Sequence, residues 1–243
     1  MNKKVLITGA SHGIGKAAAI RFAREGYTLI LNCMHSEKEL QTLKTEIQTQ
    51  YSVDCLTFVG DISSPDVVKQ IFHDTKERFG GIDILINNAG ISHIGLLSDM
   101  KDEEWRRVLS VNLDAVFYCC REAIPHMLSQ KSGRIINISS VWGNVGASME
   151  AAYSASKGGV NTLTKALAKE LAPSNIQVNA IAFGTIDTRM NSCFSNEERA
   201  ALEEEIPTGR YGTVEEAADM IYEIATAPSY LTGQVITMDG GWC

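Results

Sequence analysis

Short apolar runs alternate with longer amphipathic segments along this chain of 243 residues, and this alternation decides the fold class. The runs are rich in β-branched residues and carry few polar ones, as is typical of parallel strands buried on both faces. The pattern indicates an α/β fold, a doubly wound parallel sheet of about seven strands with helices on both faces. Strands are expected at 3–8, 28–33, 55–60, 82–87, 133–139, 176–182 and 233–238, and helices at 13–25, 36–50, 64–79, 102–130, 153–171 and 213–226.

No linker, repeat or low-complexity tract interrupts the alternation, so one Rossmann-type domain over residues 1–243 is expected. The formal net charge is −7 and basic residues form no cluster, which argues against nucleic acid as a partner. No apolar run is long enough for a membrane span or a signal peptide, so we expect a cytoplasmic protein with no membrane partner. The six cysteines and five histidines show no metal-ligand spacing, which predicts free thiols and no metal site.

The stretch "TGASHGIG" follows the first predicted strand and opens the first helix. Gly9, Gly13 and Gly15 would let the backbone turn tightly and approach a diphosphate, while the helix N-terminus would supply N–H donors. An ordinary glycine-rich turn is the alternative. The stretches "GDIS" and "NNAG" end the third and fourth strands, where Asp61 could accept a hydrogen bond from an adenine amino group or cap a helix.

Tyr153 and Lys157 lie four residues apart in "YSASK", so on a helix they share one face. A phenol holds its proton at neutral pH because its pKa is about 10, and a nearby cation would lower that pKa. The alternative is an ordinary helix, with the phenol packed inward and the ammonium in water. Ser140, at the end of the fifth strand, could hydrogen-bond a substrate oxygen or serve only in a turn. Ser140 and Tyr153 are both expected at the rim where sheets of this kind bind ligands.

Taken in order, "TGASHGIG", "GDIS", "NNAG", "VNLDAVF", "YSASK", "FGTIDTRM" and "GQVITMDGG" resemble the short-chain dehydrogenase/reductase family over essentially the whole chain. The resemblance implies an NAD(P)-dependent oxidoreductase with a catalytic tetrad of Asn112, Ser140, Tyr153 and Lys157. Tyr153 would exchange a proton with the substrate oxygen, which Ser140 would polarise. Lys157 would hold the nicotinamide ribose and lower the pKa of Tyr153, and Asn112 would hold a water that extends the proton relay.

The resemblance also implies a site for a nicotinamide nucleotide. Its expected residues are Gly9, Ser11, His12, Gly13, Ile14, Gly15, Asn32, Asp61, Ile62, Asn88, Ala89, Gly90, Tyr153, Lys157, Gly184, Ile186 and Thr188. No acid stands between Asn32 and Ser36, where an NAD-binding chain would place one on the ribose 2′-hydroxyl, so NADP(H) is favoured. The arginine usual in NADP-binding relatives is also missing, which leaves NAD(H) as the alternative.

The stretches "HGIGKA", "MKDEEW" and "DGG" resemble bacterial 3-oxoacyl-[acyl-carrier-protein] reductases, which implies a ketone substrate or an acyl thioester on acyl-carrier protein. Lys131 is one basic candidate for contact with that acidic carrier. A steroid or alicyclic alcohol is the alternative substrate, and a nicotinamide-nucleotide sensor without turnover is the alternative of another class. The residues expected to line the substrate pocket are Ser140, Trp142, Tyr153, Phe183 and Met190.

Three further expectations concern the second half of the chain. The acidic segment 191–206 is predicted to be a lid over the substrate, with a solvated surface helix as the alternative. Phe183 stands where the family usually has proline, so this position loses the proline constraint on φ. The resemblance also implies a homotetramer assembled through the two long helices.

Overall fold

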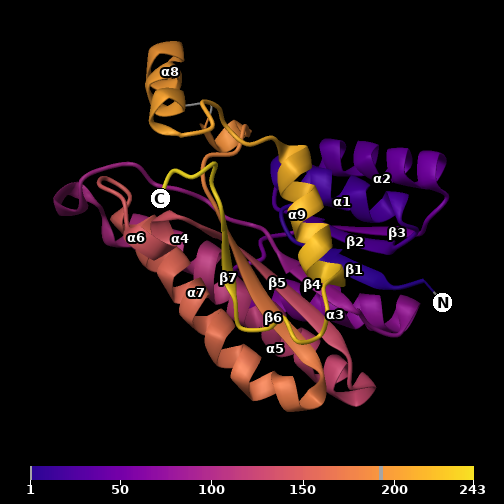
Figure 1. Cartoon of the computed structure of the whole chain (residues 1–243). Helices are drawn as coiled ribbons and strands as arrows, with labels where there is room; N and C mark the ends of the chain where they lie inside the picture. Colours follow the sequence, from indigo (N-terminus) through magenta and orange to yellow (C-terminus); the bar gives the residue numbers. More distant parts are fainter. Residues whose placement is uncertain (1, 192–193) are drawn as a thin grey trace.

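The computed structural model describes residues 2–191 and 194–243. Within them, one parallel sheet has the strand order β3-β2-β1-β4-β5-β6-β7 (Figure 1). Every predicted strand is present, with ends that differ by two residues or fewer from the expected ones. The strands are β1 (Lys4–Ile7), β2 (Thr28–Cys33), β3 (Cys55–Val59), β4 (Ile84–Asn87), β5 (Gly133–Ser140), β6 (Ile176–Phe183) and β7 (Val235–Met238).

Helices cover both faces of the sheet (Figure 1), as the alternation predicts. Two separate clusters of buried apolar side chains form the core, one on each face. The first cluster packs α1 (Gly13–Arg24), α2 (Glu37–Tyr51) and α9 (Val214–Thr226) on the sheet, and the second packs α3 (Pro65–Phe79), α5 (Ala115–Gln130) and α7 (Ala151–Leu171). Strands β2 and β6 are buried along their whole length, which explains why their sequences are almost continuously apolar.

A short chain of buried amides fixes α7 on the sheet. Asn87 at the end of β4 donates to the side-chain oxygen of Asn137 in β5 over 2.8 Å, and Asn137 donates to the Thr164 hydroxyl in α7 over 2.9 Å. All three side chains are buried, so each depends on the others for its hydrogen bonds. The network therefore sets the depth of the helix that carries Tyr153 and Lys157.

The helix predicted over 102–130 is not regular throughout. It consists of α4 (Asp102–Leu109), a π-helical turn at Ser110–Asp114 and α5. A π turn inserts an extra residue into the helical ladder and is often found at functional sites. Here the turn contains Asn112, whose buried side chain bonds to the loop after β4. The sequence pattern could not show this insertion, because the apolar periodicity continues on both sides of it.

Two short helices complete the fold at the carboxyl edge of the sheet. Helix α6 (Trp142–Val145) follows β5, and α8 (Asn196–Glu205) lies within the predicted lid segment and stands above the sheet (Figure 1). Ser192 and Cys193 of that segment fall outside the described residues. No helix in the described part of the chain combines the length and hydrophobicity that crossing a membrane requires.

Candidate active site

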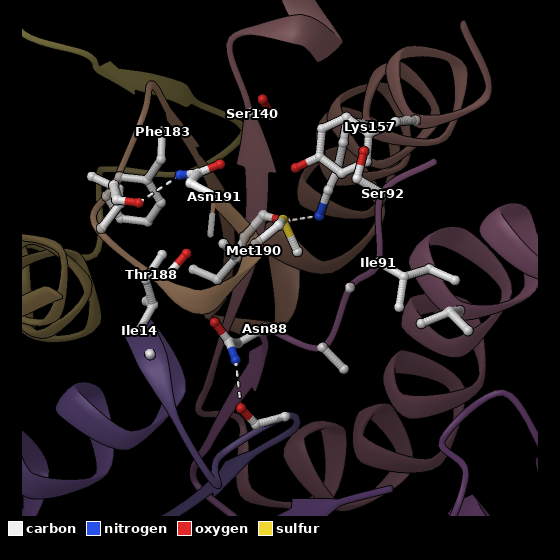
Figure 2. A pocket seen from close by; sticks show the side chains of 18 of the residues that line it. Ile14, Asn88, Ile91, Ser92, Ser140, Lys157, Phe183, Thr188, Met190 and Asn191 are labelled. Atoms are coloured by element: carbon white, nitrogen blue, oxygen red, sulfur yellow. Dashed lines mark hydrogen bonds between the residues drawn. The ribbon is translucent and has the colours of Figure 1, made fainter. Parts of the chain in front are cut away.

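A cleft of about 450 Å³ opens at the carboxyl ends of the strands. Figure 2 shows side chains around it from the ends of strands, among them Asn88, Ser140 and Phe183, and from a helix, Lys157. The predicted site residues that line it are Gly9, Ser11, His12, Gly13, Ile14, Asn32, Asp61, Ile62, Asn88, Ala89, Gly90, Ser140, Trp142, Tyr153, Lys157, Phe183, Gly184, Ile186, Thr188 and Met190. Gly15 and Asn112 are buried and do not line it. The structure thus gathers nearly all the predicted residues in one place.

The glycine-rich loop after β1 forms one wall. Gly9 and Gly13 have φ of 65° and 56°, in the left-handed region that favours glycine. Gly15 serves packing instead, because a Cβ there would lie 2.4 Å from the Gly9 carbonyl oxygen and 2.5 Å from Nδ2 of Asn88. His12 precedes α1 but its side chain does not cap the helix, so it satisfies none of the first-turn N–H groups. This wall suits an anionic group such as a diphosphate.

Charge at the β2 and β3 end of the cleft is balanced by an ion pair that the sequence did not reveal. The Asp61 carboxylate accepts hydrogen bonds from Ser63 and, over 2.7 Å, from Nη1 of Arg107. Burial alone would raise the pKa of Asp61, but these bonds lower it overall. Asn32 is buried and donates to the Gly60 carbonyl over 3.0 Å, so its amide joins β2 to the end of β3. The sequence around Arg107 does not indicate this ion pair, because Asp61 is 46 residues away.

Burial also governs His12 in the same part of the site. It lowers the pKa of the imidazole, and the charge of Arg189 lowers it further, while Glu39 acts in the opposite direction. His12 is therefore neutral at neutral pH, and as a neutral ring it offers a single N–H donor.

Tyr153 and Lys157 lie on one face of α7, as their spacing predicts. The Lys157 ammonium lies 5.6 Å from the centre of the Tyr153 ring and donates to the Ile138 carbonyl over 2.7 Å, a dashed line in Figure 2. Lys157 is only 4% exposed, and burial lowers its pKa to about 8. Tyr153 is half-buried and keeps one side on the cleft.

The expectation that the pKa of Tyr153 lies below its ordinary value is wrong for this structure. Burial raises the pKa of Tyr153 to about 12, a hydrogen bond with Ser140 opposes the rise, and the charge of Glu150 adds to it. The reason is that the ammonium is turned to the Ile138 carbonyl, so desolvation of the phenol dominates. Helical spacing alone could not show how deeply the pair is buried.

Asn112 is buried and contacts the elements that form the cleft without lining it. Its Oδ1 accepts from the Ile91 N–H over 2.9 Å, and its Nδ2 donates to the Ile91 carbonyl over 2.9 Å and to the Ser156 hydroxyl over 3.0 Å. Both amide hydrogens are therefore used, so a water held by this residue, as the resemblance implied, would donate to one of its oxygens. In the structure, Asn112 joins the loop after β4 to α7 beside Lys157.

Ser140 ends β5 directly opposite Phe183 in the β5–β6 register. Its hydroxyl accepts from the Trp142 N–H over 3.2 Å, which holds it at the start of the turn into α6. Gly184 follows Phe183, and a Cβ at this glycine would lie 2.7 Å from Cβ of Asp239. The segment after β7 therefore requires a glycine at this position.

Aromatic and apolar side chains wall the cleft near Tyr153. The Trp142 and Trp242 rings meet edge to face with centroids 4.9 Å apart, and Phe194 and Leu202 extend the wall from the segment that contains α8. Trp242 was not predicted, because its contact joins the chain end to a turn 100 residues earlier. Ser92 and Glu150 were also missed, although they line the cleft and bond to each other.

Comparison with known proteins agrees with this geometry. A family model described as short chain dehydrogenase matches residues 3–199. A Staphylococcus aureus protein named 3-oxoacyl-[acyl-carrier-protein] reductase FabG is 40% identical over 242 residues, covering 99% of this chain and 98% of the relative. The Thermotoga maritima protein of the same name is 42% identical over 240 residues, covering 98% and 97%. A Bacillus subtilis protein named uncharacterized oxidoreductase YmfI is 36% identical over 243 residues, covering 100% and 99%.

These matches extend over the same strands and loops that build the cleft. The matched segment begins just before β1 and includes the glycine-rich turn, the loop after β4, Ser140 and the Tyr153–Lys157 turn. The chain belongs to the short-chain dehydrogenase/reductase family and is an NAD(P)-dependent oxidoreductase acting on CH–OH or ketone groups.

Proposed function

We propose that the chain reduces 3-oxoacyl thioesters on acyl-carrier protein, with NADPH as the hydride donor and Tyr153 as the proton donor. The observation that carries the proposal is the position of Tyr153, half-buried in a cleft that Ser140 and Lys157 also line. Two relatives named 3-oxoacyl-[acyl-carrier-protein] reductase, 40% and 42% identical over nearly the whole chain, support the choice of substrate.

The residues of the cleft fit a nicotinamide nucleotide. The left-handed backbone at Gly9 and Gly13 and the first-turn amides of α1 would hold the diphosphate. A Cβ at Gly90 would lie 3.5 Å from the Lys157 ammonium, so this glycine leaves room for a ribose beside Lys157. Ile186 and Thr188 would contact the nicotinamide amide. When bound, the nicotinamide supplies the hydride to the substrate carbon.

Three side chains of the protein would then act on the substrate or on each other during the reaction. With a pKa of about 12, Tyr153 is protonated at neutral pH, which is the state needed to give a proton to the carbonyl oxygen. Ser140 would donate a hydrogen bond to that oxygen and polarise the carbonyl. The Lys157 ammonium, 5.6 Å from the Tyr153 ring centre, would stabilise the phenolate that forms as the proton leaves.

The preference for NADP(H) over NAD(H) rests on charge at the β2 end. Residues 32–36 contain no carboxylate that would repel a 2′-phosphate. Asp61 follows β3, the neighbour of β2, and its charge is neutralised by Arg107 over 2.7 Å. Neutral His12 adds a hydrogen-bond donor but no charge at neutral pH. The expected preference for NADP(H) is therefore modest, and a preference for NAD(H) would contradict it.

Five further properties belong to the same proposal. The chain forms one domain, and its segment 191–206 acts as a lid, since Leu202 of α8 lines the cleft. It works in the cytoplasm, where its buried thiols stay reduced. Exposed Lys131 contributes to contact with the acidic carrier. Four copies assemble through α5 and α7, because Phe117 on α5 is 46% exposed.

One observation favours a second candidate substrate. The Trp142–Trp242 pair and Phe183 give the cleft flat aromatic walls, which also suit a bulkier ketone such as a steroid or alicyclic ketone. Oxidation of NADPH and of NADH by the purified protein should be measured with 3-oxoacyl thioesters of pantetheine, the same esters on carrier protein, steroids and small diketones. The proposal expects the highest kcat/KM for carrier-bound thioester with NADPH. Turnover of free ketones alone would overturn it.

A further inference from the structure

The side chain of Glu150 reaches across the mouth of the cleft to a loop far away in sequence. Its carboxylate accepts a short hydrogen bond from the hydroxyl of Ser92, 58 residues earlier. The backbone is tied at the same point, because the Gly95 N–H donates to the Met149 carbonyl over 2.8 Å. Glu150 and Ser92 both line the cleft, and Glu150 lies three residues before Tyr153. The carboxylate is therefore held at the wall of the cleft.

Helix capping does not explain this carboxylate. Glu150 is the N-cap residue of α7, yet its side chain accepts no hydrogen bond from the helix. Met149, immediately before it, has φ of 64°, a left-handed conformation that a methionine rarely adopts. Strain of this kind tends to collect at functional sites, where the surrounding structure holds it. The local backbone thus directs Glu150 toward the cleft.

The negative charge of Glu150 acts on Tyr153, the proposed proton donor. It acts to raise the pKa of Tyr153, so its field reaches the phenol. The nearest opposing charge on the same helix, Lys157, is buried and hydrogen-bonded to the Ile138 carbonyl. Asp61 and Arg107 pair with each other four strands away in the sheet order. Apolar Ile94 and Trp142 also line the cleft.

We propose that the negative charge of Glu150 selects substrates: it admits neutral 3-oxo esters and thioesters and rejects 3-oxo acids, whose carboxylate would lie beside that of Glu150. This inference rests on the proposed function and deepens it, because it states that the acyl group must be esterified before reduction. The free carboxylate oxygen can also accept a hydrogen bond from an N–H or O–H of the neutral substrate.

The test compares methyl 3-oxobutanoate with 3-oxobutanoate, which differ by one charge near the ketone. The ratio of their kcat/KM values is measured for the wild-type chain and for Glu150→Gln, which keeps the shape and an acceptor for Ser92. Glu150→Gln removes the repulsion between two like charges that lie several Å apart in a partly wet cleft. The ratio of kcat/KM values should therefore change by about tenfold in favour of the acid. A ratio equal to that of the wild type would overturn the inference.

Two matched variants separate charge from structure. Ser92→Ala removes the hydrogen bond but keeps the carboxylate, so it should retain the wild-type preference for the ester. Glu170→Gln makes the same change in net charge on the exposed far end of α7, about 30 Å along the helix, and should leave the ratio unchanged. If either variant matches Glu150→Gln, the inference fails. A wild-type chain that reduces neither of these compounds nor the carrier-bound thioester refutes the proposed function, whereas reduction of the ester with an unaltered ratio refutes only the charge selection.

Discussion

The Lys157 ammonium lies 5.6 Å from the centre of the Tyr153 ring and donates a hydrogen bond to the backbone carbonyl of Ile138. The two groups are close enough to interact, yet burial controls both of them in the free protein. It raises the pKa of the phenol to about 12 and lowers that of the ammonium to about 8. At neutral pH both therefore carry their protons, which is the state that reduction of a ketone requires.

The first prediction concerns the direction of the reaction. Ketone reduction should be fastest below pH 8 and fall above it, because Lys157 then loses the charge that stabilises the phenolate. Oxidation of the alcohol should rise with pH, since it needs Tyr153 deprotonated and its pKa is about 12. Initial rates in both directions between pH 6 and about 10 check this. Reduction that accelerates as the pH rises would contradict it.

The second prediction links Lys157 to stability. Its pKa is about 8 in the folded chain and about 10.4 in an unfolded one, so between these values the unfolded state binds more protons. The free energy of unfolding contributed by this residue should therefore increase with pH over that window. Urea unfolding of wild type and Lys157→Met at pH 7.5 and about 9.5 measures it. The wild type should gain more on raising the pH, and equal gains would show that the ammonium is not desolvated.

A third prediction tests Asn112 as a positioning residue. Asn112→Ala removes three hydrogen bonds, one buried and two partly buried, and takes away the partner of both backbone groups of Ile91, which should lower the free energy of unfolding by about 2–4 kcal/mol. The turnover number should fall as well, because the loop after β4 loses its tie to α7. Chemical unfolding and steady-state rates give both values. An unchanged stability would mean that the loop holds its place without this amide.

Two helical glycines provide the fourth prediction. Gly15→Ala places a Cβ 2.4 Å from the Gly9 carbonyl oxygen and should destabilise the fold by more than about 2 kcal/mol and weaken nucleotide binding. Gly158→Ala, on α7, meets its nearest neighbour at 3.4 Å and should be neutral or stabilise by up to about 1 kcal/mol. Thermal unfolding of the two variants checks the contrast, and a reversal of their order would contradict the structure.

The sequence predicted most of the sheet and the rim, because both depend on local patterns. Strand β2 was predicted over its full observed range, since six buried residues in a row leave no ambiguity. The glycine turn and the Tyr153–Lys157 spacing are local as well. Contacts between distant segments were not predicted, as for Arg107 with Asp61 and Ser92 with Glu150. The pKa of Tyr153 was wrong for a related reason, because burial is a property of the packed fold.

The most direct test of the account is Tyr153→Phe, which removes one hydroxyl and keeps the ring. Turnover of a 3-oxoacyl thioester with NADPH should fall by about a thousandfold, while NADPH binding, followed by fluorescence titration, stays close to that of the wild type. Tyr230→Phe, at a fully exposed tyrosine, serves as the control and should keep the wild-type rate. If Tyr153→Phe turns over at the wild-type rate, Tyr153 is not the proton donor and the account is wrong.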